Sequence, residues 1–291
     1  MDVITLVVAG LANGSLYALV ALGLLLIYKT QDVVNFAHGE ILMVGAFVGY
    51  TVFHIVRLPY PVALLIAVLA CGALGMAVER LAFRRIAHLH HITLAMVTVG
   101  LSFALKGAAR VPFGSDIYTF PPMFGQLPPI IIGTAVISIQ SLVTIGVAVL
   151  LALILYLFFR STTTGKQMRA TQQNLVGAQL IGINTGRIFS STWAIACAVG
   201  GAAGVLAAPV SLLYPDMGTS FLLKGFAAAV LGGFESIPGA ILGALLVGVI
   251  EMLFGGFVST AFQHVSAFCI IILVLFIKPH GLFGQKSAHR V

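Results

Sequence analysis

Long apolar runs separated by short polar intervals make up most of this chain. A straight membrane-spanning helix needs about 20 predominantly apolar residues, and several runs are shorter than that. Short, broken segments near Glu40 and Glu235 indicate half-helices or re-entrant pieces, which a membrane tolerates where protein or a water-filled cavity covers them. We therefore expect an all-α polytopic membrane protein with about eight or nine transmembrane helices, including short or broken ones. The runs with few or no charges are Val3–Tyr28, Ile41–Val56, Val62–Val78, Ile92–Ala109, part of Ile130–Phe159, Ile188–Ala208, Met217–Phe234, Ile237–Ile250 extending toward Val258, and His264–Ile277.

The composition supports this class. Of 291 residues, 60% are apolar and 8% are charged, whereas a soluble domain carries roughly a quarter charged residues. A β-barrel would show alternating segments of about ten residues, and here the apolar runs are continuous. Basic residues that lie beside anionic lipid explain the formal net charge of +7. We therefore expect membrane lipid, and no nucleic acid, among the partners.

The distribution of basic residues predicts the orientation. If the N-terminus lies outside and nine segments cross, only Arg57, Lys106, Arg110 and Lys224 face outward. Cytoplasmic loops carry the excess of Lys and Arg, so the N-terminus is expected outside and the C-terminus in the cytoplasm. Lys106, Lys224 and Glu251 then fall near span ends, where long side chains reach the interface. The inner side receives eleven of the fifteen basic residues: Lys29, Arg80, Arg84, Arg85, Arg160, Lys166, Arg169, Arg187, Lys278, Lys286 and Arg290.

The longest polar interval is Arg160–Arg187. It contains no acid and four basic residues, Arg160, Lys166, Arg169 and Arg187. The positive-inside rule places it in the cytoplasm. Apolar residues recur in it at roughly helical spacing, with Gly182 and an Asn-Thr-Gly turn near its end. We expect a short surface helix that ends in a tight turn, either as a solvated basic loop or as a docking site for a cytoplasmic partner.

No catalytic motif is found in the sequence. Gly165-Lys166 lacks the upstream glycine of a phosphate-binding loop, and neither H-E-x-x-H nor G-x-S-x-G occurs. The His88-Leu89-His90-His91 cluster has no carboxylate or thiol beside it, so a solvated loop explains it better than a metal site. We expect no catalytic residue, no metal and no cofactor in this chain.

One polar stretch runs directly into an apolar segment. The interval from Lys29 to Glu40, KTQDVVNFAHGE, carries charges and amides up to the run that begins at Ile41. A carboxylate at membrane depth costs about 2.5–3.5 kcal/mol on insertion scales, so Glu40 is expected to face the bundle interior or to lie at its rim. Asn35, His38 and Glu40 therefore mark a helix start that could line a translocation route.

Several long motifs occur in order along nearly the whole chain. They are Asn13-Gly14-Ser15-Leu16-Tyr17-Ala18-Leu19 with Ala21-Leu22-Gly23-Leu24, Val34-Asn35-Phe36-Ala37-His38-Gly39-Glu40, Gly45-Ala46-Phe47, Arg169-Ala170, Gly182-Ile183-Asn184, Ala228-Ala229-Val230-Leu231-Gly232-Gly233, Ser236-Ile237-Pro238-Gly239-Ala240 and Lys278-Pro279-His280-Gly281-Leu282-Phe283-Gly284. Together they resemble the branched-chain amino acid ABC importer permeases of the LivH type. Several motifs in the right order are more specific than any one of them.

The resemblance implies one permease domain over residues 1–291 in the bacterial inner membrane. The implied partners are a second homologous permease, two cytoplasmic ABC ATPase subunits and a periplasmic substrate-binding protein, so this chain is not itself an enzyme. The Arg160–Arg187 interval becomes an ATPase-coupling loop, with the coupling residues Arg169, Ala170, Asn174, Ala178, Gly182, Ile183 and Asn184. The expected translocation residues are Asn13, Ser15, Asn35, His38, Glu40, Gly232 and Gly233.

The function that the resemblance implies is the passage of branched-chain or other hydrophobic amino acids across the membrane. Thr171-Gln172-Gln173-Asn174 replaces a more acidic run of the leucine importers, which leaves urea, short amides or aromatic acids as alternative substrates. A stand-alone secondary transporter or channel is the less favoured alternative. It would need membrane-embedded acids or bases on several spans, and only Glu40 is a candidate.

Overall fold

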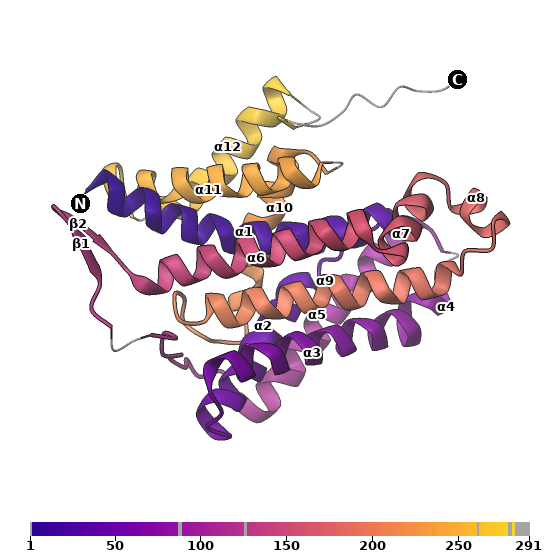
Figure 1. The fold of residues 1–291 in the computed structure, drawn as a ribbon, viewed down its shortest axis with the longest axis horizontal. Coiled ribbons are helices and arrows are strands. Elements are labelled where there is room, and N and C mark those ends of the chain that lie inside the picture. The colour runs from indigo at the N-terminus through magenta and orange to yellow at the C-terminus, as the bar shows by residue number, and fades with distance from the viewer. Residues whose placement is uncertain are drawn as a thin grey trace. The chain divides into compact units, whose positions relative to one another are not determined.

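The computed structural model describes residues 2–86, 89–124, 127–234, 236–260, 262–278 and 281–282. Within these ranges the chain is helical apart from one short hairpin, an isolated bridge and the connecting segments (Figure 1). The elements are α1 (Val3–Gln31), α2 (His38–Tyr50), the π-helical η1 (Thr51–Ile55), α3 (Tyr60–Val78), the π-helical η2 (Glu79–Phe83), α4 (Arg84–Ile86), α5 (His91–Phe113), β1 (Ile130–Ile132), β2 (Ala135–Ile137), α6 (Ile139–Ser161), α7 (Thr163–Gln173), α8 (Leu175–Leu180), α9 (Thr185–Ala207), α10 (Met217–Gly232), α11 (Ile237–Phe257) and α12 (Gln263–Ile277).

Seven helical stretches among the described residues are long and apolar enough to cross a membrane. A membrane helix satisfies its own backbone polar groups, so the continuous apolar runs of the sequence fold as long helices. The chain is thus a multi-pass membrane protein, as its sequence predicted. Two further apolar helices are short for a straight crossing: α10 has 16 residues and α12 has 15. The seven stretches are Val3–Gln31, His38–Ile55, Tyr60–Ile86, His91–Phe113, Ile139–Ser161, Thr185–Ala207 and Ile237–Phe257.

The chain forms two compact units. Unit 1 comprises Met1–Leu25, Pro122–Ala148 and Phe221–Val291, and unit 2 comprises Leu26–Pro121 and Val149–Ser220. Three helices, α1, α6 and α10, contribute residues to both units. The break that the sequence indicates near Glu235 falls on a residue outside the described ranges.

Unit 2 is built around α9, which packs against both α2 and α3 (Figure 1). Glycines allow the helix backbones to approach closely. A methyl group on Gly45 of α2 would overlap the backbone of Gly201 in α9, and one on Gly204 would overlap the backbone of Leu42. Close contact of this kind is typical of membrane helices with small residues at their interfaces. The buried Trp193 completes the core, with its ring 4.5 Å from that of Phe83 between centroids.

Unit 1 uses the same device between α1 and α11. A methyl group on Gly14 would lie 2.8 Å from the Ala244 carbonyl oxygen, and one on Gly10 would lie 2.6 Å from Val249 Cα. Both distances are well inside van der Waals contact, so only glycine fits without a shift of the backbone. On its other side, α11 contacts α12.

A β-hairpin in unit 1 departs from the expected all-α class. β1 pairs antiparallel with β2, with Ile130 opposite Ile137. Gly133 between them has φ +64°, which a two-residue hairpin turn requires, and β-branched residues flank the turn. The apolar run that begins at Ile130 therefore starts as a hairpin, and α6 begins only at Ile139.

Candidate functional site

The polar stretch before α2 enters the helical bundle of unit 2. α1 ends at Gln31 and α2 begins at His38. Between them, the backbone N–H of Phe36 donates to Thr98 Oγ1 at 3.0 Å. Thr98 lies about two turns into α5, counted from His91. α2 therefore begins beside the interior of α5. With η1 it forms the stretch His38–Ile55, which is long and apolar enough to cross a membrane, so the half-helix or re-entrant piece expected near Glu40 is wrong.

Charged side chains surround this helix start, and we call them with Thr219 the Glu40 cluster: Glu40, Lys106, Arg110, Asp216 and Thr219. Glu40 Oε1 lies 3.2 Å from Lys106 Nζ. Lys106 Nζ donates to Thr219 Oγ1 at 2.9 Å, and Thr219 Oγ1 donates to Glu40 Oε1 at 3.3 Å. Nearer the end of α5, Arg110 Nη2 lies 2.7 Å from Asp216 Oδ2. The cluster thus joins α2, α5 and the first turn of α10.

Burial makes the pairing in this cluster necessary. The Glu40 side chain is 1% exposed and that of Lys106 is 15% exposed. An unpaired ion in such surroundings costs several kcal/mol, and the N-terminus of α2 adds a partial positive charge that favours a carboxylate. The expectation that Lys106 reaches an interface from a span end is therefore wrong, because Glu40 offers it a charge partner inside the bundle.

Asn35 and His38 are fully buried. Asn35 Oδ1 accepts from the backbone N–H of Ala37 at 3.0 Å. In contrast, Asn35 Nδ2, both ring nitrogens of His38 and Glu40 Oε2 have no hydrogen-bond partner among the described residues. Buried polar atoms are normally bonded to protein or to water, so this segment has the capacity to bind water or a polar ligand.

The other predicted translocation residues belong to unit 1 and have packing or turn roles there. Ser15 Oγ donates to a carbonyl one turn earlier in α1, at 2.7 Å. Asn13 Nδ2 lies 3.4 Å from the sulfur of Met252. Gly232 packs against the backbone of α11, and Gly233, with φ +94°, follows the end of α10. The Asn35–Glu40 segment, in contrast, belongs to unit 2.

A second buried ion pair lies in unit 1. Lys224 Nζ is 2.6 Å from Glu251 Oε1. Tyr17 OH donates to Glu251 Oε2 at 2.8 Å, and Lys224 Nζ donates to Tyr17 OH at 3.2 Å. The side chains of Lys224 and Glu251 are 9% and 1% exposed, so the expectation that they reach the interface from span ends is wrong. Opposite charges on α10 and α11 neutralise each other inside the unit instead.

A third buried carboxylate belongs to the Glu79 network, which we define as Glu79, Arg84, Gly186 and Ser190. Arg84 binds Glu79 with two bonds, Nε to Oε1 at 3.2 Å and Nη2 to Oε2 at 2.9 Å. Arg84 Nη2 also donates to the Gly186 carbonyl at 2.6 Å and to Ser190 Oγ at 2.7 Å, while Ser190 Oγ donates to Glu79 Oε2. The network ties η2 to the first turns of α9.

The sequence indicated Glu40 as the single candidate for an embedded acid, and this is wrong. Glu40, Glu79 and Glu251 are each at most 1% exposed. Each of them pairs with a basic side chain. Sequence reasoning missed Glu79 because it stands beside Arg80 at the end of an apolar run, where an exposed position is the usual interpretation.

The Arg160–Arg187 interval forms two short helices where one was expected. α7 and α8 meet at Asn174, whose Oδ1 accepts from the Gly177 N–H at 2.8 Å. The side chains of Thr162 and Asn184 cap α7 and α9 in the same way. Side-chain caps at helix starts satisfy free backbone donors, so each short helix has a defined beginning. The predicted coupling residues Asn174 and Asn184 are both such caps.

Gly182 adopts the positive φ of a tight turn, as its position in the sequence suggested. Its φ is +82°, and a Cβ there would meet nothing within 4 Å. The N–H of Gly182 donates to the Gln179 carbonyl and that of Ile183 to the Ala178 carbonyl, both at 3.0 Å. Hydrogen bonds around a left-handed residue are a common way for a helix to end. Ala178 is buried beneath this turn.

The tip of this interval is apolar and exposed. Leu180 is 83% exposed, Ile181 75% and Val176 63%. Arg169 is exposed on α7, and Ala170 beside it is half-buried. Exposed apolar side chains rimmed by polar residues are typical of an interaction surface.

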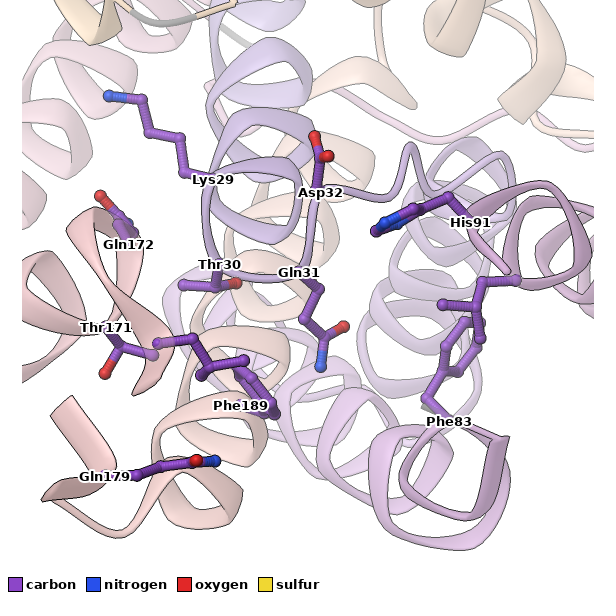
Figure 2. A pocket seen from close by; sticks show the side chains of 12 residues that line it. Lys29, Thr30, Gln31, Asp32, Phe83, His91, Thr171, Gln172, Gln179 and Phe189 are labelled. Carbon is purple, nitrogen blue, oxygen red and sulfur yellow. The ribbon is translucent and has the colours of Figure 1, made fainter. Parts of the chain in front are cut away.

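A cavity of about 530 Å³ in unit 2 lies beside this interval. Figure 2 shows Thr171 and Gln172 of α7 on one side, Phe83 and His91 on the other, and the end of α1 between them. His91 belongs to the histidine cluster of the sequence but begins α5, so it does not lie in a loop. His88 lies outside the described ranges. Among the residues that the structure describes, no group of three His, Cys, Asp or Glu could hold a metal ion.

The seven long apolar helical stretches define a multi-pass membrane protein, and the charges that they enclose are paired. The family model described as branched-chain amino acid transport system / permease component matches residues 6–277. The chain belongs to this family.

Named relatives agree with the family model over almost the whole chain. The high-affinity branched-chain amino acid transport system permease protein LivH of Escherichia coli (strain K12) is 32% identical over 97% of this chain and 96% of its own length. LivH of Salmonella typhimurium matches to the same extent. BraD of Pseudomonas aeruginosa, a permease protein with the same description, is 31% identical over 98% of this chain and 96% of its own length. The resemblance drawn from the sequence motifs is confirmed.

Proposed function

We propose that this chain is the transmembrane permease subunit of an ATP-binding cassette importer for branched-chain or other hydrophobic amino acids in the bacterial inner membrane. The observation that carries the proposal is the exposed apolar tip at α8, in a chain that belongs to a permease family. The chain forms one permease domain over residues 1–291 with eight or nine crossings, its N-terminus outside and its C-terminus in the cytoplasm. Its partners are a second homologous permease, two cytoplasmic ATPases that hydrolyse ATP, and a periplasmic binding protein.

The apolar tip supports an ATPase as the partner at α7 and α8. Leu180 and Ile181 expose large apolar surface, and covering such surface contributes about 25 cal/mol per Å². The side-chain caps at Asn174 and Asn184 fix the conformation of the tip, so docking to a partner costs little conformational entropy. Arg169 adds a positive charge that suits an acidic groove.

The Glu79 network supplies a route from this tip into the membrane. Arg84 contacts Gly186 and Ser190 in the first turns of α9, where the Arg160–Arg187 interval ends, and contacts Glu79 at the start of η2, which continues α3. A displacement of the α8–α9 turn therefore acts on two spanning helices that already pack on each other. Contiguous contacts of this kind can carry coupling between distant sites.

The proposed translocation route uses the Asn35–Glu40 segment together with Asn13, Ser15, Gly232 and Gly233. The unpartnered polar atoms of Asn35, His38 and Glu40 can bind the polar ends of an amino acid in passing. Because Glu40 is already paired with Lys106, we expect the route to hold substrate weakly. The separate binding protein then provides the affinity.

The alternative of a stand-alone secondary transporter is favoured by one observation. Glu40, Glu79 and Glu251 are three embedded carboxylates, and proton-coupled transporters use such groups. Each of the three is held by a basic partner, which supports a structural role instead. Urea, short amides and aromatic acids remain the alternative substrates for the importer.

Uptake by the reconstituted complex tests the proposal. The chain is assembled with its partner permease, the ATPases and the binding protein, and offered leucine, phenylalanine, urea and acetamide with and without ATP. We expect uptake of leucine that requires both ATP and the binding protein. Uptake by this chain alone along a proton gradient would support the secondary transporter, and ATP-driven uptake of urea alone would change the substrate.

A further inference from the structure

The cavity beside α7 and α8 has a mixed chemical lining. Lys29 and Asp32 line it with one positive and one negative charge, and Gln31, Gln172 and Gln179 add side-chain amides. Apolar groups close the remaining sides, among them Phe83, Leu94 and Phe189. Figure 2 shows the side chains of Gln31 and His91 extending toward the same space. All lining residues belong to unit 2.

This combination selects a class of ligand. One acid and one base suit a molecule that carries both charges, amides suit its carboxylate and ammonium groups, and aromatic and aliphatic walls suit an apolar side chain. A phosphorylated ligand would want several cations, and a lipid chain would leave the amides unpaired. The volume of about 530 Å³ admits an amino acid and several waters.

We propose that this cavity binds an α-amino acid zwitterion with an aliphatic side chain from the side of the membrane that carries α7 and α8. The proposal rests on the function proposed above, under which that side is the cytoplasm and the amino acid is the transported product. The product then binds next to the coupling segment after delivery.

Occupancy of the cavity would restrain coupling. Thr171, Gln172 and Gln179 belong to α7 and α8, whereas Gln31, Asp32 and His91 belong to the end of α1, the segment after it and the start of α5. A ligand that contacts both groups stabilises the arrangement in which they are close. Movement of the coupling segment then requires release of the ligand, so cytoplasmic amino acid lowers ATP hydrolysis and import.

The chain contains its own reporter for this cavity. Trp193 is the single tryptophan of the sequence. Its Nε1 donates to Gln31 Oε1 at 2.8 Å, and its ring contacts that of Phe83. Because Gln31 and Phe83 both line the cavity, a bound ligand changes the surroundings of Trp193.

Binding to the purified full chain in nanodiscs is the first test. L-Leucine should shift the emission of Trp193 saturably and bind in equilibrium dialysis, with a dissociation constant in the range of about 0.1–1 mM. 4-Methylpentanoate lacks only the ammonium group of leucine and 3-methylbutylamine lacks only the carboxylate, so each should bind at least about tenfold more weakly. Equal binding of the three compounds, or no saturable binding of leucine by either method, overturns the proposal.

Variants assign the binding to the cavity. Asp32 has φ +53°, a conformation that Asn also accepts readily, so Asp32→Asn removes the charge and preserves the backbone. It should weaken leucine binding about tenfold, and Gln179→Ala, at an exposed position of α8, should weaken it as well. Asp116→Asn, at an exposed acid in the connection after α5, is the matched control and should bind leucine normally. Normal binding by both cavity variants overturns the assignment.

The assembled complex separates this inference from the proposed function. Leucine added on the cytoplasmic side should lower binding-protein-stimulated ATP hydrolysis by about fivefold or more, and the degree of inhibition should fall in Asp32→Asn. ATP-driven uptake with no inhibition by cytoplasmic leucine overturns the inference and leaves the proposed function standing. Leucine binding in the cavity of a complex that imports no amino acid overturns the proposed function and leaves the binding site.

Discussion

Arg84 donates a hydrogen bond of 2.6 Å to the carbonyl oxygen of Gly186, 102 residues further along the chain. Through this bond the first residue of α4 contacts the second residue of α9, near the end of the Arg160–Arg187 interval. The same guanidinium holds the buried carboxylate of Glu79. One side chain therefore fixes both an embedded charge and the position of the α8–α9 turn.

Loss of Arg84 should lower both the stability of the chain and its coupling to ATP hydrolysis. Arg84→Gln leaves the buried carboxylate of Glu79 without its charge partner, which should lower the free energy of unfolding by about 1–3 kcal/mol. The lost ion pair itself adds little to this cost, because the Arg84 side chain is half-exposed. We expect a lower thermal unfolding midpoint in detergent and weaker stimulation of ATP hydrolysis by the loaded binding protein. Arg85→Gln, at an exposed neighbour, is the control. Wild-type stimulation in Arg84→Gln would exclude the Glu79 network from the coupling route.

The turn at Gly182 should tolerate Asn and reject Trp. Its φ of +82° is accessible to Gly and, at modest cost, to Asn, but strained for a bulky side chain. Gly182→Trp should retain membrane insertion and pairing with the second permease, and it should abolish substrate-stimulated ATP hydrolysis or detach the ATPases. Gly182→Asn should retain most activity. Normal transport by Gly182→Trp would show that the Arg160–Arg187 interval is a solvated loop and does not dock to the ATPases.

Reversal of charge at Arg169 should weaken docking of the ATPases. Arg169 is exposed on α7, and a surface substitution usually changes folding stability by no more than about 0.5 kcal/mol. Arg169→Glu should therefore leave expression and membrane insertion normal while lowering co-purification of the ATPases. Lys166→Glu, another exposed reversal on the same helix, tests whether the position or the net charge matters. Full co-purification with Arg169→Glu would remove Arg169 from the interface.

Removing one partner of the Lys224–Glu251 pair should destabilise the protein more than replacing both. Lys224→Met leaves Glu251 uncompensated in a buried site, which typically costs about 3–5 kcal/mol. We expect low abundance in the membrane and a reduced thermal midpoint. Lys224→Met combined with Glu251→Met should recover much of the loss, because an apolar pair of similar volume is tolerated. A single variant as stable as wild type would show that the charge is solvated in the protein.

Labelling of introduced cysteines tests the orientation. Both Ser161, at the end of α6, and Ser115, after α5, are exposed. In a background without the native cysteines, a membrane-impermeant thiol reagent should reach Ser161→Cys only from the cytoplasm and Ser115→Cys only from outside. The same labelling at Ser287, which lies outside the described ranges, should report a cytoplasmic C-terminus. Cytoplasmic labelling at Ser115→Cys would reverse the orientation proposed from the charges.

Substrate should bind weakly to the isolated permease. The embedded charges of the spans are already paired, so along the proposed translocation route a zwitterion finds mainly amides and backbone dipoles. We expect a dissociation constant for leucine weaker than about 1 μM, or about 8 kcal/mol. Isothermal titration of the purified chain measures it, and tighter binding would contradict the proposed weak route.

Local pattern predicted much of the fold and part of the site. The continuous apolar runs predicted long helices, and the polar stretch up to Glu40 predicted that α2 starts within the bundle. The tight turn at Gly182 was predicted correctly, because glycine is the residue that most readily adopts the positive φ of such a turn. In each case the cause is the residue itself or its immediate neighbours.

Contacts between distant segments could not be predicted in this way. Lys224 and Glu251 are 27 residues apart on different helices, and no local pattern shows that two charges will neutralise each other. The same applies to Glu79, whose partner Ser190 lies 111 residues away. The division of the coupling segment at Asn174 was missed for another reason, because an Asn can continue a helix weakly or cap the next one.

Glycines bring the backbone of α9 into direct contact with that of α2. Side chains that interlock between two helices resist axial movement, since each must change rotamer to pass its neighbour. Gly45 and Gly201 meet backbone to backbone, and Gly204 meets the backbone at Leu42, so at these positions no interlocked side chain opposes shear of α9 along α2. Gly200 also lies against the His38 ring. An axial shift of α9 that began at the α8–α9 turn would therefore change the contact between Gly200 and the buried ring of His38.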